Sequence, residues 1–201
     1  TIDVCRGDEA WNSSQVWYMP FDDLNAEVTS DITWWPWREW YYTINVCNFA
    51  ISRCGEDNSQ LSNKMKRIKG QVLFLRGLSY YNLVGYYQNP PLITDYATYS
   101  SLDGLYTTNS TYDNVLDQVE KDFHEAMELL PSRDEGGEWA GGRATCGAAA
   151  GYYARALMMR QKYSDALTVL KDIIGKKYGT YRLMSNYGDN FREGSAYENN
   201  A

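Results

Sequence analysis

The sequence predicts a mainly α-helical protein built from tetratricopeptide (TPR)-like antiparallel helix pairs with long irregular loops. Apolar residues recur at three- and four-residue spacing in several segments, as expected for helices with one buried face. Ser or Thr precedes several of these segments and Gly or Pro follows them, which is typical of helix ends. Small residues in the last two segments allow paired helices to approach closely. Spacing alone fits an ordinary antiparallel helical bundle equally well.

The composition is that of a globular protein, and it limits the partners. The chain has 201 residues, of which 44% are hydrophobic and 22% are charged, so it has enough apolar surface to fold. Its net charge of −7 disfavours nucleic acid as a partner. No apolar stretch approaches the ~18 residues of a membrane-spanning helix. The single histidine, His124, argues against His-rich metal sites and His-based catalytic triads.

One long helix is predicted after an irregular start. Residues 1–36 show no clear period, apart from a short helix around 22–28. Pro36 marks a break, because proline disfavours helical backbone at the residue before it. Residues 37–53 then carry an apolar stripe, and Gly55 follows as a stop. The stripe consists of Trp40, Ile44, Cys47 and Ile51.

The longest helix is predicted over residues 62–87, with Ser62 at its start. Its expected apolar face comprises Met65, Ile68, Val72, Leu75, Leu78 and Asn82. Residues 88–110 form a long insertion rich in Tyr, Ser, Thr and Asp. Loops of this length are usually functional or braced by their own packing.

Three shorter helices follow the insertion. Residues 111–130 have Thr111 as N-cap and an apolar face of Leu116, Val119, Phe123, Ala126 and Leu130. Thr145 is predicted to cap a helix that ends near Arg160, and a last helix covers 163–177. Residues 178–201 are expected to be irregular.

The cysteines are predicted to be free and buried. Cys5, Cys47, Cys54 and Cys146 contain no CxxC pair, so no zinc or thioredoxin-like site is indicated. Cys47 and Cys54 would lie roughly 10 Å apart along one helix, beyond the reach of a disulfide unless the helix ends between them. The chain opens without a signal-peptide pattern, which fits an intracellular protein or a mature piece of a longer one.

Several segments, in order along the chain, resemble the SusD/RagB family of outer-membrane nutrient-binding lipoproteins. Residues 70–84, GQVLFLRGLSYYNLV, are similar to the family's FLRA..YF.LV helix, and the PLIT at 91–94 fits the PL.T that follows it. GRAT at 142–145, with residues 148–156, resembles GR.T..AA..L.AR. Further likenesses lie at residues 24–31, 40–48, 112–131 and 181–191.

The resemblance implies that residues 1–201 are the N-terminal or central part of a SusD-like α-helical domain, with an insertion at 88–110 and the remainder of the protein absent. It implies a non-catalytic surface glycan-binding protein that cooperates with a SusC-like TonB-dependent transporter in nutrient uptake, without a cofactor. The ligand would be an oligosaccharide or a peptide. The location would be the bacterial outer membrane at the cell surface, through a lipid anchor outside this chain, because Cys5 lacks the apolar signal expected before an anchoring cysteine.

Trp34, Trp35 and Trp37 are the first candidates for ligand binding, since they stand together at the entrance of a predicted helix. An indole offers a large apolar face to the C–H face of a sugar ring, and nearby polar groups then orient the hydroxyls. The second candidates, from the insertion and the Gly-rich loop, are Tyr96, Tyr99, Tyr106 and Trp139. For all of them the alternative is packing, because large aromatic side chains are usually mostly buried.

Two other functions remain open. A helical repeat scaffold can instead bind peptides or proteins. A glycan-processing enzyme would need two carboxyl groups roughly 5–10 Å apart across a cleft. Carboxylates gather in the sequence at Asp22, Asp23, Glu27 and Asp31, but this proximity does not establish such a pair. Arg76 and Arg143 are predicted to be structural, each bonding a carboxylate or carbonyl groups between helices.

Overall fold

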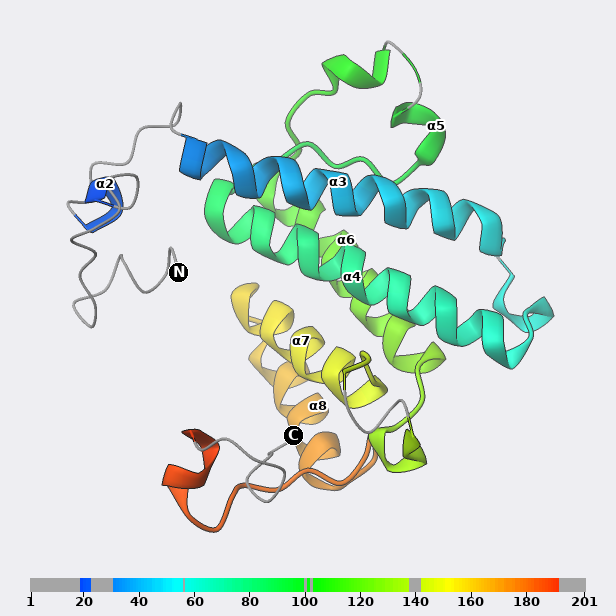
Figure 1. The fold of residues 1–201 in the computed structure, drawn as a ribbon, viewed down its shortest axis with the longest axis vertical. Helices are drawn as coiled ribbons and strands as arrows, with labels where there is room; N and C mark the ends of the chain where they lie inside the picture. Colours follow the sequence, from blue (N-terminus) through cyan, green and yellow to red (C-terminus); the bar gives the residue numbers. More distant parts are fainter. Residues whose placement is uncertain are drawn as a thin grey trace. The chain divides into compact units, whose positions relative to one another are not determined.

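The computed structural model describes residues 19–22, 31–55, 57–99, 101, 103–137 and 142–191 (Figure 1). Every regular element in these ranges is helical, which confirms the predicted mainly α-helical class. None of the helices in them is both long and apolar enough to cross a lipid bilayer. The chain divides into two compact units, 1–43 and 44–201.

The first unit contains the short helix α2 (Met19–Asp22) and the beginning of α3 (Asp31–Cys54). The helix predicted around 22–28 falls mostly outside the described residues. The predicted break at Pro36 is wrong, because α3 passes through this residue. Pro36 is the sixth residue of the helix, so its missing N–H removes a single backbone bond, to the carbonyl of Ile32 in the first turn. A helix of 24 residues tolerates that loss near its end.

The second unit contains the rest of α3 and four further long helices. These are α4 (Asn63–Tyr87), α6 (Tyr112–Leu129), α7 (Cys146–Met159) and α8 (Tyr163–Ile174). α4 packs on α6, α6 on α7 and α7 on α8, and the partners in each pair run antiparallel (Figure 1). Short helices occupy the connections and the end, namely η1 (Asn58–Gln60), α5 (Tyr96–Tyr99), η2 (Asp103–Tyr106), η3 (Arg133–Glu135) and η5 (Tyr187–Phe191).

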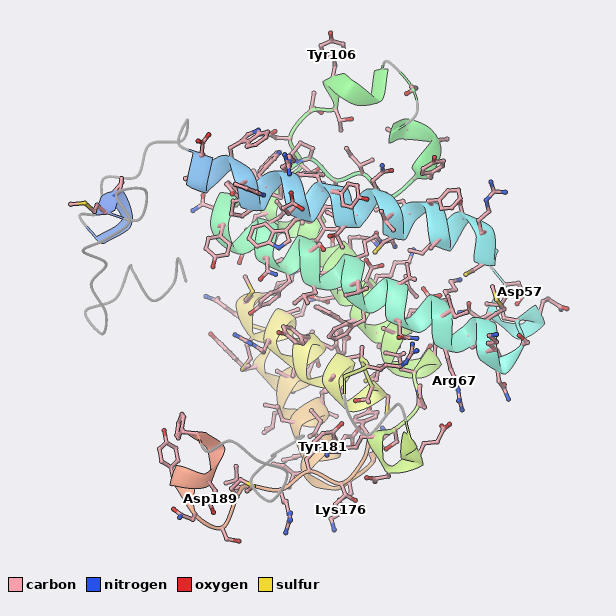
Figure 2. The ribbon with its side chains drawn as sticks, viewed as in Figure 1. Asp57, Arg67, Tyr106, Lys176, Tyr181 and Asp189 are labelled. Carbon is pink, nitrogen blue, oxygen red and sulfur yellow. The ribbon has the colours of Figure 1, made fainter. Side chains whose placement is uncertain are left out.

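The helix ends follow the sequence signals closely. The side-chain oxygens of Ser62, Thr111 and Thr145 accept backbone N–H groups three residues later. This confirms the predicted N-caps Thr111 and Thr145, and it makes Ser62, predicted as the first helical residue, the N-cap of α4. Gly55 follows the last residue of α3 with φ of 81°, a conformation that glycine adopts without steric cost. α8 ends at Ile174, three residues before the predicted end. Tyr181, from the irregular segment that follows, lies against the start of α7, where its hydroxyl is 3.3 Å from Thr145 Oγ1 (Figure 2).

The predicted apolar face of α4 is wrong. Ile68 and Leu75 are exposed, whereas Arg76 and Gly77 are buried. A Cβ atom at Gly77 would lie 3.2 Å from the ring of Phe123, so glycine at this position lets α4 and α6 approach closely. The prediction chose the wrong side of the helix, because the large apolar side chains that α4 buries lie on another face, together with Lys69, Arg76 and two glycines. These apolar residues are Leu73, Phe74, Tyr80, Leu83 and Val84.

Arg76 and Asp122 form an ion pair between α4 and α6 in the core of the second unit. Arg76 Nε and Nη2 donate to the two carboxylate oxygens of Asp122 at 2.8 and 2.7 Å, and Asp122 is 1% exposed. Gln118 Nε2 donates to the same carboxylate at 2.8 Å. Burial raises the pKa of the Asp122 carboxyl, and these hydrogen bonds oppose that shift. The bidentate geometry confirms the predicted structural role of Arg76.

This ion pair also anchors the start of the insertion. Arg76 Nη1 donates to Asn48 Oδ1 at 2.9 Å, and Asn48 Nδ2 donates to the carbonyl of Ile93 at 2.8 Å. The Tyr80 hydroxyl donates to that carbonyl and accepts the Ile93 N–H, both at 2.8 Å. The root of the insertion is therefore held by side chains of α3 and α4, in line with a long loop braced by packing.

Lys69, in the lysine-rich first turns of α4, is buried. Its Nζ donates to the Gly55 carbonyl at 3.0 Å and to Asn58 Oδ1 at 2.9 Å, and lies 3.2 Å from Glu125 Oε1. These partners compensate the charge and connect the α3–α4 turn to α6.

Cys47, Cys54 and Cys146 are free and buried, as predicted, and Cys5 lies outside the described residues. Cys47 and Cys54 both lie on α3, so the helix does not end between them. Burial raises the pKa of the Cys47 thiol to about 11.

Replacing Arg76 by Ala should destabilise the protein by about 3–5 kcal/mol, because it leaves the Asp122 carboxylate buried without its partner. Urea unfolding measures this change. The matched control is Arg67→Ala, which removes an exposed ion pair to Glu135 and should cost about 1 kcal/mol or less. Equal losses in the two variants would contradict the role assigned to the buried pair.

The raised pKa of Cys47 predicts a loss of stability at high pH. The folded state holds the thiol proton more tightly than the unfolded state, so the stabilisation is complete below pH 9 and is lost as the pH rises to about 11. Across this window the unfolding free energy of the parent should fall by up to about 2–3 kcal/mol more than that of Cys47→Ala. Urea unfolding at intervals of one pH unit tests this, and parallel curves would refute it.

Candidate functional site

Two adjacent indoles lie exposed near the start of α3, in the first unit. Trp34 is 50% exposed and Trp35 is 58% exposed. Both rings project from one continuous helix, which fixes the positions of their Cα atoms. Their exposure leaves apolar aromatic surface available to a ligand, but their role in binding stays a prediction.

Trp37 differs from its two neighbours. It is half-buried, and its ring lies 4.9 Å from the ring of the buried Tyr41, centroid to centroid. The spacing of four residues places the two rings on one face of α3. Trp37 therefore contributes to packing, which was the alternative considered for the tryptophans.

Arg38 and Glu39 complete a charged cluster around the exposed indoles. Arg38 Nε and Nη2 donate to Glu39 Oε1 at 3.1 and 2.6 Å, and the Trp35 indole Nε1 donates to the same oxygen at 3.2 Å. The guanidinium carbon of Arg38 lies 5.2 Å from the Trp34 ring centroid and 5.6 Å from that of Trp35. Such distances are typical of cation–π contacts.

Two neighbouring side chains in this cluster set the charge state of Glu39. The hydrogen bond from Arg38 lowers the pKa of the Glu39 carboxyl, and the Trp35 indole contributes a smaller effect in the same direction. Glu39 therefore remains a carboxylate at neutral pH. Sequence reasoning missed both residues, although their spacing of three or four residues from the indoles was a usable signal.

The remaining candidates are distributed differently. Tyr96, on α5 in the second unit, is half-buried and packs edge-on against Phe49 at 5.0 Å between ring centroids. Tyr106, at the end of η2, is 84% exposed and points away from the helices (Figure 2). Trp139, the Tyr99 side chain and the acidic residues Asp23 and Glu27 lie outside the described residues.

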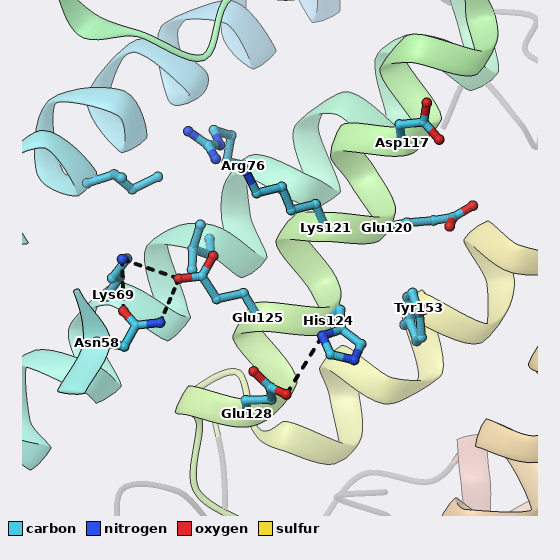
Figure 3. A pocket seen from close by; sticks show the side chains of 12 residues that line it. Asn58, Lys69, Arg76, Asp117, Glu120, Lys121, His124, Glu125, Glu128 and Tyr153 are labelled. Atoms are coloured by element: carbon cyan, nitrogen blue, oxygen red, sulfur yellow. Dashed lines mark hydrogen bonds and ion pairs between the residues drawn. The ribbon is translucent and has the colours of Figure 1, made fainter. Parts of the chain in front are cut away.

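A shallow hollow of about 850 Å³ lies along α6 in the second unit (Figure 3). Its lining is mostly charged, and much of that charge is already paired. Glu125 contacts Lys69, while Glu120 accepts from Lys162 at 2.8 Å. The other charged lining residues are Arg76, Asp117, Lys121, His124 and Glu128.

The chemistry of this hollow does not suit stacking against a sugar. Its one aromatic side chain besides His124 is Tyr153, whose ring packs edge-on against His124 at 5.4 Å. His124 is exposed, and its Nδ1 lies 3.9 Å from Glu128 Oε1. Among the described residues, the pair Trp34–Trp35 with Arg38 and Glu39 is thus the stronger candidate.

Arg143 lies shortly before the start of α7. Its Nη1 donates to Gln71 Oε1 of α4 at 3.0 Å. This bond joins the segment before α7 to α4, which agrees with the predicted structural role.

A SusD-like family model, described as "Starch-binding associating with outer membrane", matches residues 3–158. The SusD-like protein P25 of Formosa agariphila is 24% identical over 165 residues, or 80% of this chain and 29% of that protein. This chain thus spans under a third of the length of that curated relative.

Solved structures show the same helical fold. A SusD superfamily protein from Bacteroides vulgatus superposes with a TM-score of 0.80 at 21% identity, covering 98% of this chain and 41% of that protein. A SusD-like carbohydrate-binding protein from Bacteroides fragilis gives 0.74 at 23% identity, covering 92% and 34%. A laminarin-binding SusD-like protein gives 0.74 at 24% identity, covering 89% and 38%.

The exposure of the tryptophans predicts their contributions to stability. Trp37→Ala should destabilise the protein by about 2–3 kcal/mol, because it removes the ring packed on Tyr41. Trp34→Ala and Trp35→Ala should each cost about 1 kcal/mol or less, since their rings are half in solvent. Urea unfolding of the three variants distinguishes the two classes. Similar losses at all three positions would show that Trp34 and Trp35 are packing residues as well.

Proposed function

Because this chain belongs to the SusD-like family, we propose that it is part of a non-catalytic glycan-binding protein of the bacterial outer membrane. One observation in the described residues carries the proposal at the level of the site. Trp34 and Trp35 present half-exposed indoles side by side in sequence on one helix, with the charged groups of Arg38 and Glu39 in contact with them.

This arrangement supplies both kinds of contact that a sugar needs. The C–H face of a pyranose ring loses water when it stacks on an indole, which provides the apolar part of the affinity. Carboxylate oxygens of Glu39 can accept hydrogen bonds from hydroxyls, and guanidinium N–H groups of Arg38 can donate to them. Neither contact requires a nucleophile or a pair of catalytic carboxyls, which is why we propose capture rather than cleavage.

We propose further that the full protein hands its ligand to a SusC-like TonB-dependent transporter and is held at the cell surface by a lipid anchor. The family description of association with the outer membrane supports this assignment. Stacked antiparallel helices such as α4, α6, α7 and α8 offer an extended flank to a protein partner. The ligand class we favour is an oligosaccharide.

The site is tested by affinity electrophoresis of the full-length protein in gels that contain laminarin or amylopectin. The double variant Trp34→Ala/Trp35→Ala should lose about tenfold or more in affinity, because each stacked ring is worth roughly 0.5–1.5 kcal/mol beyond its area. The control is Tyr163→Ala, which removes an exposed aromatic ring of α8 and should leave retention unchanged.

Unchanged retention of the double variant in a gel that retards the parent would remove the assignment of these two residues. A parent that is retarded by neither polysaccharide, but binds peptides, would favour the alternative of a helical peptide-binding scaffold.

A further inference from the structure

Arg38 is the one basic side chain in residues 31–43, and its charge is neutralised beside the exposed indoles. Its Nε and Nη2 atoms both donate to Glu39 Oε1. This edge of a guanidinium is one that binds a carboxylate or a sulfate through two parallel hydrogen bonds. For an acidic group on a sugar, the Nε–Nη2 edge of Arg38 is therefore already occupied by Glu39.

The position of this ion pair makes it relevant to whatever stacks on the indoles. The guanidinium carbon lies within 5.6 Å of both ring centroids, and Glu39 accepts a bond from the Trp35 indole itself. A sugar that covers the Trp35 ring thus places its substituents close to a carboxylate. With Asp31, residues 31–43 carry two acidic side chains and one basic side chain, so their net charge is −1.

We infer that the Arg38–Glu39 ion pair makes the Trp34–Trp35 surface selective for uncharged glycans over glycans that carry uronate or sulfate groups. The inference rests on the proposed glycan-binding function and adds the class of sugar and the residues that set it. Neutral hydroxyls lose little from the pairing, because they can still bond to polar atoms of both side chains. A second carboxylate near Glu39 is repelled, and Arg38, the one basic side chain in residues 31–43, is already paired with Glu39.

The test is a charge cycle at positions 38 and 39 in the full-length protein. Affinity electrophoresis at low ionic strength compares laminarin, which is neutral, with polygalacturonate, which carries a carboxylate on every sugar. Glu39→Gln keeps the shape of the side chain and its acceptor oxygen but leaves the charge of Arg38 uncompensated. Its affinity for polygalacturonate should rise by about two- to fivefold, the range set by exposed charge pairs, and the gain should shrink in high salt.

Two further variants identify the cause of that gain. Arg38→Gln/Glu39→Gln has no charge at either position and should return polygalacturonate affinity to the parent value. Glu128→Gln makes the same change in net charge on the exposed face of α6 and should leave both affinities at parent values.

The outcomes separate the inference from the function on which it rests. The selectivity is overturned if Glu39→Gln raises the affinity for polygalacturonate no more than Glu128→Gln does. If the parent still binds laminarin through Trp34 and Trp35 in that case, the glycan-binding function stands. A parent that prefers polygalacturonate to laminarin also overturns it. A parent that binds no polysaccharide at all overturns the proposed function and, with it, this inference.

Discussion

The second unit depends on one buried charge pair. Arg76 of α4 lies inside the protein, where an unpaired guanidinium is costly, so Asp122 of α6 must be placed opposite it. The remaining donor at Nη1 is satisfied by Asn48, whose amide in turn holds the carbonyl of Ile93. One ion pair thereby fixes the register of two helices, the end of α3 and the root of the insertion. An error in any of these placements would leave a buried polar group without a partner.

The small residues of the core follow from the same constraint. Arg76 can reach Asp122 along two short hydrogen bonds because the adjacent Gly77 lets α4 lie against the ring of Phe123. Close approach continues toward the C-terminus, where α7 and α8 pack through short side chains. That cluster comprises Ala150, Ala154, Leu157, Ala166 and Val169. Glycine and alanine at these contacts thus let the helices of each pair lie close together. Polar bonds then select one register among those that packing would allow.

Sequence patterns predicted the parts of this fold that local chemistry decides. The N-caps and the amphipathic α6 are confirmed, because capping hydroxyls and apolar periodicity act within a few residues. The family resemblance, which rests on several segments in order along the chain, is confirmed as well. The face of α4 and the burial of Lys69 were missed, since both depend on partners far away in sequence. Pro36 was over-weighted as a helix breaker, because its cost depends on its position in the helix. At the site, composition pointed to the indoles, but the ion pair between Arg38 and Glu39 becomes visible only when helical spacing is applied to charged side chains.

The exposed indoles differ physically from the aromatic rings of the core. Phe74, Phe123 and Tyr152 pack together with centroids 5.5–5.7 Å apart, so their rings contribute to folding. Trp34 and Trp35 gain little from folding, because half of each ring stays in water. Arg38 contacts both rings and is itself held by Glu39, so the indoles have fewer rotamers available before any ligand arrives. A surface ordered in this way pays less conformational entropy on binding. The same two charged residues therefore orient the aromatic rings and remove the net positive charge beside them, which ties the shape of the surface to its preference among ligands.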